Sequence, residues 1–167
     1  MLDRRPDGAT AAWCAAQGIG LLAYGALAGG FLSERWLGQP PPADPENRSL
    51  VKYRLIIDEF GGWDRLQVLL SALDGVARRH GVPIGSVAIR WVLDRPGVTG
   101  VIVGARHSRH LAATLAAGAL ALDADDHAAI AAAQAGAPGP AGEVYGLERV
   151  PHGPHAAIMR YNLNRTP

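Results

Sequence analysis

Two short apolar runs limit what this chain can fold into. Ile19–Tyr24 is an apolar run bounded by glycines, and Val98–Val103 is a second; both have the length and composition of buried strands. Helical patterns separate them, and strands that alternate with helices indicate a parallel sheet with helical crossovers. Two parallel strands cannot bury both of their faces. The sequence therefore predicts an α/β fold that is incomplete within this chain, with sheet faces left exposed.

Helical patterns fill much of the remaining sequence. A short helix is predicted from Pro6 to Gln17, and Gly18 closes it. The clearest helix begins at Trp63 and ends before Gly81. Its apolar stripe consists of Leu66, Leu69, Leu70, Leu73, Val76 and Ala77. The next helix has one apolar face, made of Ile84, Val87, Ala88, Trp91 and Val92. Two alanine-rich helices follow the second apolar run.

Two regions lack a regular pattern. Prolines at positions 40, 41, 42 and 45 predict a long loop over residues 25–49. The last residues, 143–167, show no firm period, and we expect them to be irregular.

Composition narrows the class of protein. The chain has 167 residues, 49% of them hydrophobic and 19% charged, which is typical of one globular domain. The net charge of +1 gives no basis for nucleic-acid or membrane-surface binding, and no apolar run reaches the ~18 residues of a membrane span. Cys14 is the one cysteine, so no internal disulfide can form. We expect Cys14 to be a buried structural thiol and the setting to be reducing and cytoplasmic.

The stretch "VIVGARHSRHL" carries the stronger chemical signal. A predicted strand ends at Gly104, and Ser108 is placed to cap a helix beyond it. Arg106 and Arg109 lie on either side of that helix start, where the helix dipole normally favours acidic residues. A bound anion would remove the conflict, and the loops after the last strands of (β/α)-barrels hold phosphate. The alternative is a solvated loop with two arginines.

Other residues offer weaker sites. The small residues of "AYGALAGG" would let a ligand approach the backbone closely, although a flexible loop explains them as well. The histidine pairs His107/His110 and His152/His155 lack acidic or cysteine partners at ligand spacing, so we expect no metal site. The carboxylates of Asp58, Glu59 and Asp64 could be imagined as a glycosidase pair, but helix capping or solvated charge is the simpler interpretation.

Several motifs in order make the chain resemble the aldo/keto reductases, from Leu2 to Asn164. The stretches that carry the likeness are "LDRRP", "GIGLLAYGALAGGFLSERWLG", "RSL.KY", "IIDEFGGWD", "VAIRWVLDRPGVTGVIVGARHSRHL" and "VYGLER…IMRYNLN". The family is a (β/α)₈ TIM barrel that reduces aldehydes and ketones with NADPH. The resemblance implies the C-terminal part of such a barrel: strands seven and eight with their helices over residues 1–136, and a C-terminal extension of the same domain over 137–167.

The same resemblance implies a cofactor site for NADP(H). Tyr24 matches the aromatic residue that stacks on the nicotinamide, and the following loop would lie along the pyrophosphate. The residues that match the cofactor loops are Tyr24, Gly25, Ala26, Leu27, Gly30, Gly104, Ala105, Arg106, His110 and Thr114. Four positions depart from the family pattern. The usual Ser after the tyrosine is Gly25, and an Arg or Gln followed by Glu-Asn is replaced by His110, Ala113 and Thr114. The losses at positions 110, 113 and 114 should weaken the hold on the adenine end.

The family's catalytic Asp, Tyr, Lys and His lie on the first four strands and have no counterpart here. In the family, "LDRRP" follows strand six, so we expect a truncated reductase that keeps the cofactor part and is inactive alone. The complete barrel would take a small carbonyl compound, and a missing N-terminal half is a candidate partner. The alternative is a non-catalytic nucleotide-binding or interaction module derived from the same family.

Overall fold

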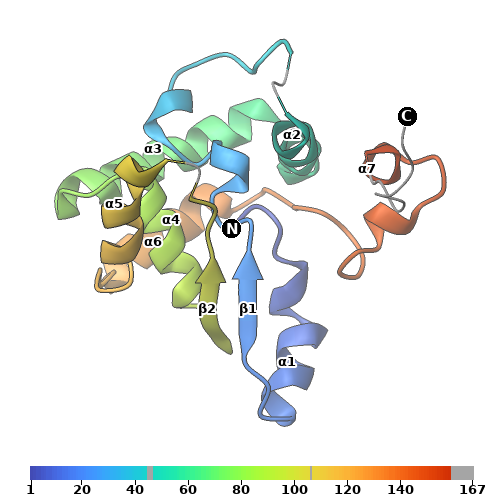
Figure 1. Cartoon of the computed structure of the whole chain (residues 1–167), viewed down its shortest axis with the longest axis horizontal. Helices are drawn as coiled ribbons and strands as arrows, with labels where there is room; N and C mark the ends of the chain where they lie inside the picture. Colours follow the sequence, from blue (N-terminus) through green and yellow to red (C-terminus); the bar gives the residue numbers. More distant parts are fainter. Residues whose placement is uncertain (45–46, 106, 159–167) are drawn as a thin grey trace.

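The two predicted strands form a parallel pair. The structure is a computed structural model that describes residues 1–44, 47–105 and 107–158. Within them, β1 (Leu21–Tyr24) and β2 (Val98–Ile102) are the only strands and lie side by side (Figure 1). Leu22 is opposite Gly100 and Tyr24 is opposite Ile102, so both strands end at the same edge. The parallel pairing and the helical crossover are confirmed.

Seven α-helices are described around this pair, and their bounds follow the chain order. They are α1 (Ala9–Ala16), α2 (Arg48–Phe60), α3 (Trp63–His80), α4 (Ile84–Leu93), α5 (Leu111–Ala116), α6 (Ala124–Gln134) and α7 (Pro154–Ala157). Helix α2 was not predicted. It begins where the Asn47 side chain accepts a hydrogen bond from the Leu50 N–H at 3.1 Å, and it ends at Gly61.

The core is helical and lies between α2, α3, α4 and α6. All six residues of the predicted α3 stripe are buried, and five of them are fully inaccessible. The predicted face of α4 is buried with them, and Ile130 of α6 closes the cluster. Both helix predictions are therefore confirmed, because burial follows the 3.6-residue period read from the sequence.

An aromatic cluster holds the proline-rich segment against the core. Phe31 packs against Trp36 and Trp63, with ring centroids 5.1 and 5.7 Å away. Gln67 donates a hydrogen bond to the Trp36 carbonyl at 2.9 Å and accepts one from the Gly38 N–H at 2.7 Å. The segment is thus irregular, as predicted, but it is tied down by side chains of α3.

One face of the sheet is open. Leu22, Tyr24 and Ile102 are 65%, 54% and 59% exposed, whereas Leu21 and Ala23 on the opposite face are half-buried. The prediction of fully buried strands is wrong for this face, because the helices of the chain cover only the other one. The prediction that part of the sheet stays exposed is confirmed.

The C-terminal segment returns across the molecule toward the first residues. It runs from α6 to α7 past the N-terminus (Figure 1). Gln134 donates to the Met1 carbonyl, Arg5 donates to the Glu143 carbonyl at 3.1 Å, and His155 lies 3.3 Å from Glu59. This segment is mostly irregular, as expected. The division of the chain at residue 136 stays a prediction.

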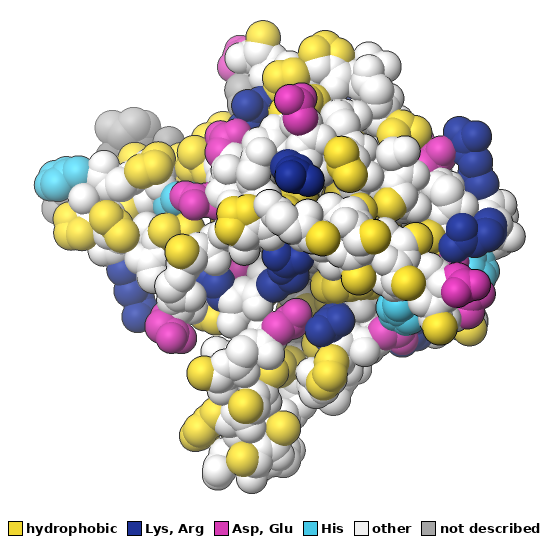
Figure 2. Space-filling model, turned by 180° about the vertical axis from the view of Figure 1, so that it is seen from behind, with side chains coloured by type: hydrophobic (Ala, Val, Ile, Leu, Met, Phe, Trp, Pro, Cys, Tyr) yellow, Lys and Arg dark blue, Asp and Glu magenta, His cyan; other side chains and the backbone are white. Residues whose placement is uncertain are grey.

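The surface carries charges of both signs. On the face shown in Figure 2, basic and acidic side chains are interspersed, and hydrophobic side chains are scattered over the lower projection formed by α1. Cys14 of α1 is buried, as predicted. Among the residues that the structure describes, no helix is long and apolar enough to cross a membrane.

Candidate functional site

Two adjoining hollows lie where the strands end. The first, which we call the glycine groove, has a volume of about 560 Å³. Its lining is Gly25, Ala26, Leu27, Gly29, Gly30, Asn47, Ser49, Tyr53, Ile102, Val103 and Gly104. The second, the tyrosine hollow, has about 370 Å³ and lies between the N-terminal residues, β1, α2 and the C-terminal segment. Gly25, Ala26 and Tyr53 line both. Ligands of parallel α/β proteins bind at this carboxyl edge.

The groove brings the two predicted loops together. Gly25, Ala26, Leu27 and Gly30 follow β1, and Gly104 follows β2. A Cβ placed on Gly30 or Gly104 would meet no atom within 4 Å, so both backbones face open space. Gly30 also has a φ of +101°, which favours glycine. These two positions therefore fit a ligand that lies directly against the backbone.

The other glycines of this loop serve a different purpose. A Cβ on Gly25 would lie 1.8 Å from the Tyr53 hydroxyl, and one on Gly29 would lie 2.8 Å from Tyr53 Cδ2. The small residues at 25 and 29 thus make room for the Tyr53 ring of α2. The prediction that the small residues let a ligand approach the backbone therefore does not hold at Gly25 and Gly29, where a side chain of the protein takes up the space.

Tyr24 lies in the tyrosine hollow, at the end of β1. Its hydroxyl is 3.1 Å from the Tyr145 hydroxyl, and the Lys52 ammonium is 5.5 Å from its ring centroid. Burial and the hydrogen bond with Tyr145 raise the pKa of the Tyr24 hydroxyl. The hydroxyl therefore stays protonated at neutral pH, and the ring keeps a substantial exposed surface.

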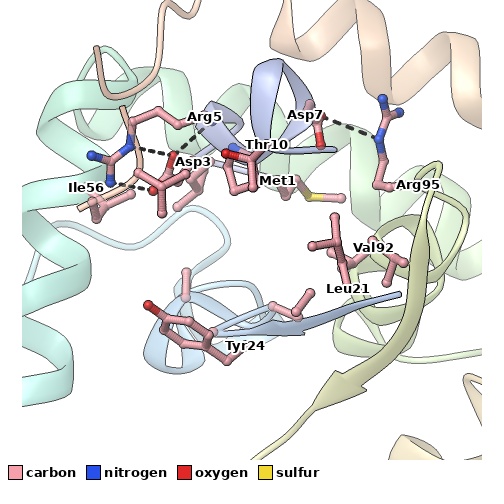
Figure 3. A pocket seen from close by; sticks show the side chains of 18 of the residues that line it. Met1, Asp3, Arg5, Asp7, Thr10, Leu21, Tyr24, Ile56, Val92 and Arg95 are labelled. Atoms are coloured by element: carbon pink, nitrogen blue, oxygen red, sulfur yellow. Dashed lines mark hydrogen bonds and ion pairs between the residues drawn. The ribbon is translucent and has the colours of Figure 1, made fainter. Parts of the chain in front are cut away.

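Charged groups form the wall opposite Tyr24. Figure 3 shows Asp3 and Arg5 across the hollow from Tyr24, and the ion pair of Asp7 with Arg95 beside them. The Arg5 guanidinium donates two hydrogen bonds to the Asp3 carboxylate, at 3.0 and 2.7 Å, and the Arg5 backbone N–H donates a third at 3.1 Å. Hydrogen bonds from Arg5 lower the pKa of Asp3 although partial burial of the carboxyl opposes this. Asp3 and Arg5 belong to the "LDRRP" motif, and no role in a site was predicted for them from the sequence.

Only part of the predicted cofactor loop after β2 lines the glycine groove. Arg106 lies outside the described residues. Ala105 is exposed, and Arg109 donates a hydrogen bond to His110 at 3.0 Å. Thr114 is half-buried on α5. Neither His110 nor Thr114 lines the groove.

The prediction that Ser108 caps a helix is wrong. Ser108 is the first residue of a 3-10 turn that extends to His110, and the residue at the cap position before that turn is His107. Helix α5 starts only afterwards, at Leu111. The tighter turn postpones the α-helix by a few residues, so the serine lies too early in the chain to cap it.

The weaker candidate sites take part in structural contacts. Asp58 forms an ion pair with Arg54 at 3.1 Å, and Glu59 lies against the buried His155. Asp64 is exposed in the first turn of α3. No cluster of three metal-ligating side chains occurs within residues 1–44, 47–105 and 107–158.

Three residues of the glycine groove were not predicted from the sequence: Asn47, Ser49 and Tyr53. Asn47 and Ser49 lie in the stretch predicted as a loop, and Tyr53 lies just beyond it, in the first half of α2. An Asn three residues before an apolar helical pattern is a capping signal that would have located this helix. That α2 lines the groove depends on how it packs against the rest of the protein, which no pattern of neighbouring residues indicates.

Comparison with known proteins identifies the family. The profile of the aldo/keto reductase family matches residues 1–135. Flagellar radial spoke protein 5 of Chlamydomonas reinhardtii is 41% identical over 85 residues, which are 48% of this chain and 16% of that protein. An aryl-alcohol dehydrogenase of Pestalotiopsis microspora is 33% identical over 113 residues, 68% of this chain and 26% of that protein. The chain thus spans a minor part of the length of both relatives. With a family match over most of its length, this chain belongs to the aldo/keto reductase family.

Proposed function

We propose that this chain is the cofactor-binding part of an NADP(H)-dependent oxidoreductase that reduces a small carbonyl compound. One observation carries the proposal. The open backbones of Gly30 and Gly104 lie in one groove, at the carboxyl ends of two adjacent parallel strands. A long phosphate-bearing ligand suits such a groove, because backbone N–H groups at loop and helix starts can bind phosphate oxygens directly.

The two hollows suit the two ends of a dinucleotide. Tyr24 in the tyrosine hollow would stack on the nicotinamide, and Gly25, Ala26 and Leu27 would pass along the pyrophosphate. Gly104, Ala105 and Arg106 would hold the adenosine 2′-phosphate, with His110 and Thr114 farther along the same segment. When bound, the cofactor supplies a hydride to the carbonyl carbon. The acid that protonates the carbonyl oxygen would come from a part of the barrel outside this chain.

Binding tests the proposal directly. NADPH titrated into the chain should show enhanced nicotinamide fluorescence, and NADH should bind more weakly because it lacks the 2′-phosphate. Gly104→Ala places a methyl group in the groove and should weaken NADPH binding by about tenfold, or ~1.4 kcal/mol. Gly75→Ala on α3 is the matched control, since its Cβ also meets no atom within 4 Å but lies away from the groove. Equal affinities of the two variants would contradict this site.

Turnover should be absent from the chain alone. We expect no NADPH-dependent carbonyl reduction by the pure 167-residue protein, because it carries no catalytic Asp, Tyr, Lys and His set of the family. Clear turnover would contradict the proposal that the catalytic residues lie in a part of the barrel outside this chain.

A second candidate function is a nucleotide-binding module without catalysis. The helical core favours it, because Phe31, Phe60, Leu66 and Ile130 are fully buried by residues of this chain. A sharp, cooperative thermal transition together with NADPH binding would support this module. A broad, non-cooperative transition would contradict it.

A further inference from the structure

Tyr53 occupies the point where the two hollows meet. Its ring lies across the loop after β1, with Cδ2 against Gly29 and the hydroxyl against Gly25. The hydroxyl is 1.8 Å from where a Cβ on residue 25 would lie. A side chain at position 25 and the Tyr53 hydroxyl therefore exclude each other. The aldo/keto reductases usually have a serine where this chain has Gly25. The space that the serine side chain would fill is taken up here by the hydroxyl of Tyr53 from α2.

The Tyr53 hydroxyl is available for a ligand. Tyr53 lines both the glycine groove and the tyrosine hollow. No hydrogen bond of this hydroxyl is found among the described residues, and Tyr53 is partly buried. A polar group that is partly removed from water and unpaired in the protein gains most from a ligand that pairs with it.

A cation, the Lys52 ammonium, lies near the ring of Tyr53. The Lys52 ammonium lies 5.7 Å from the Tyr53 ring centroid and 5.5 Å from that of Tyr24. Burial, with a smaller effect of the Asp3 charge, raises the pKa of the Tyr53 hydroxyl, so it stays protonated and can donate. A hydroxyl donor on a ring with a cation nearby matches a phosphate oxygen, which accepts hydrogen bonds and carries charge.

We propose that the Tyr53 hydroxyl donates a hydrogen bond to a pyrophosphate oxygen of the dinucleotide, from a position that only glycine at residue 25 leaves open. This inference rests on the proposed function. It makes Tyr53 a binding residue that joins the nicotinamide end of the site to the phosphate end.

The test compares Tyr53→Phe with the unchanged chain, using two probes. The probes are NADPH, followed by fluorescence, and adenosine 2′-monophosphate, followed by saturation-transfer NMR; only the first contains a pyrophosphate. Phenylalanine fits the same space, and a thermal melt confirms that the fold is kept. Loss of a hydrogen bond to a charged group should weaken NADPH binding by about tenfold or more, and binding of adenosine 2′-monophosphate should not change.

The other possible outcomes separate the role of the Tyr53 hydroxyl from the proposed function of the chain. Unchanged NADPH affinity in Tyr53→Phe overturns the role of the hydroxyl and leaves the proposed function standing. Equal weakening of both probes also overturns it, because the substitution would then act through the shape of the groove. Failure of the unchanged chain to bind NADPH overturns the proposed function itself, and this inference with it.

Discussion

The Tyr24 hydroxyl lies 3.1 Å from the Tyr145 hydroxyl, so the C-terminal segment contacts the end of strand β1 across 121 positions of sequence. The backbone of Tyr145 has a φ of +64°, a left-handed conformation that is unusual for a residue other than glycine. Such a conformation persists only where surrounding contacts hold it. Arg5 supplies those contacts, through the Glu143 carbonyl and the side chain of Glu148.

Arg5→Ala should release this segment. The Arg5 side chain is 4% exposed and bridges the N-terminal turn to residues 143–148. Hydrogen exchange of the amides in 143–149 should accelerate strongly in Arg5→Ala and only slightly in Tyr145→Phe, which removes one partly exposed hydroxyl. Arg78→Ala serves as the control, because the Arg78 side chain is highly exposed and its partner Asp74 lies on the same helix. Equal exchange in all three variants would show that Arg5 does not hold the segment.

Asp126 should make stability depend on acidity. Burial of its carboxylate opposes ionisation, but hydrogen bonds from His80 and Arg79 and from the Asp123 backbone N–H outweigh this and lower the pKa of Asp126 to about 2. A carboxyl whose pKa is lower in the folded state stabilises the fold above the unfolded pKa of about 4 and loses that contribution as the pH falls toward 2. We expect a loss of about 2 kcal/mol in the free energy of unfolding over this range.

Denaturant unfolding at a series of pH values measures this loss. Asp126→Asn should lower stability at pH 7 by about 3 kcal/mol and flatten the profile between pH 4 and 2. The same substitution at Asp74, whose ion pair with Arg78 lies at the surface, should leave the profile unchanged. A profile that keeps its slope in Asp126→Asn would assign the acid sensitivity to other carboxyls.

Substitution of Gly75 within α3 and of Gly81 at its C-terminal cap should change stability in opposite directions. Gly75 lies inside the helix and is exposed, so Gly75→Ala should stabilise the fold by about 1 kcal/mol through helix propensity. Gly81 ends the helix with a φ of +63°, so Gly81→Ala should destabilise it by about 1 kcal/mol. Thermal melts of the two variants check both signs. An increase in the melting temperature of Gly81→Ala would contradict the left-handed backbone conformation at the end of α3.

The open face of the sheet should promote association. Leu22 and Ile102 are exposed on neighbouring parallel strands, and apolar sheet surface of this kind favours aggregation. Leu22→Thr with Ile102→Thr should reduce light scattering at high protein concentration while the melting temperature changes little. Val68→Thr, at an exposed apolar residue of α3, is the control and should leave scattering unchanged.

Much of the helical framework was predictable because its signals are local. The stripe of α3, its arginine-rich last turn and Gly81 are each set by neighbours within a few positions, and burial followed them. Strand positions were also readable from apolar runs. Burial on both strand faces was not, because it depends on which elements cover them. Helix α2 was missed because the prolines before it extended the predicted loop past its Asn47 cap.

For the candidate site, the sequence by itself determined which glycines follow each strand, and the structure decided what each one faces. Gly30 and Gly104 are open, whereas Gly25 and Gly29 accommodate Tyr53 from a helix that lies far along the chain. The contact of Tyr24 with Tyr145 and the bridge made by Arg5 likewise join distant segments. Local periodicity reports only a residue's neighbours in sequence. The space beside a glycine depends on distant segments of the chain that pack against it. Only the tertiary structure could therefore show which glycines face open space.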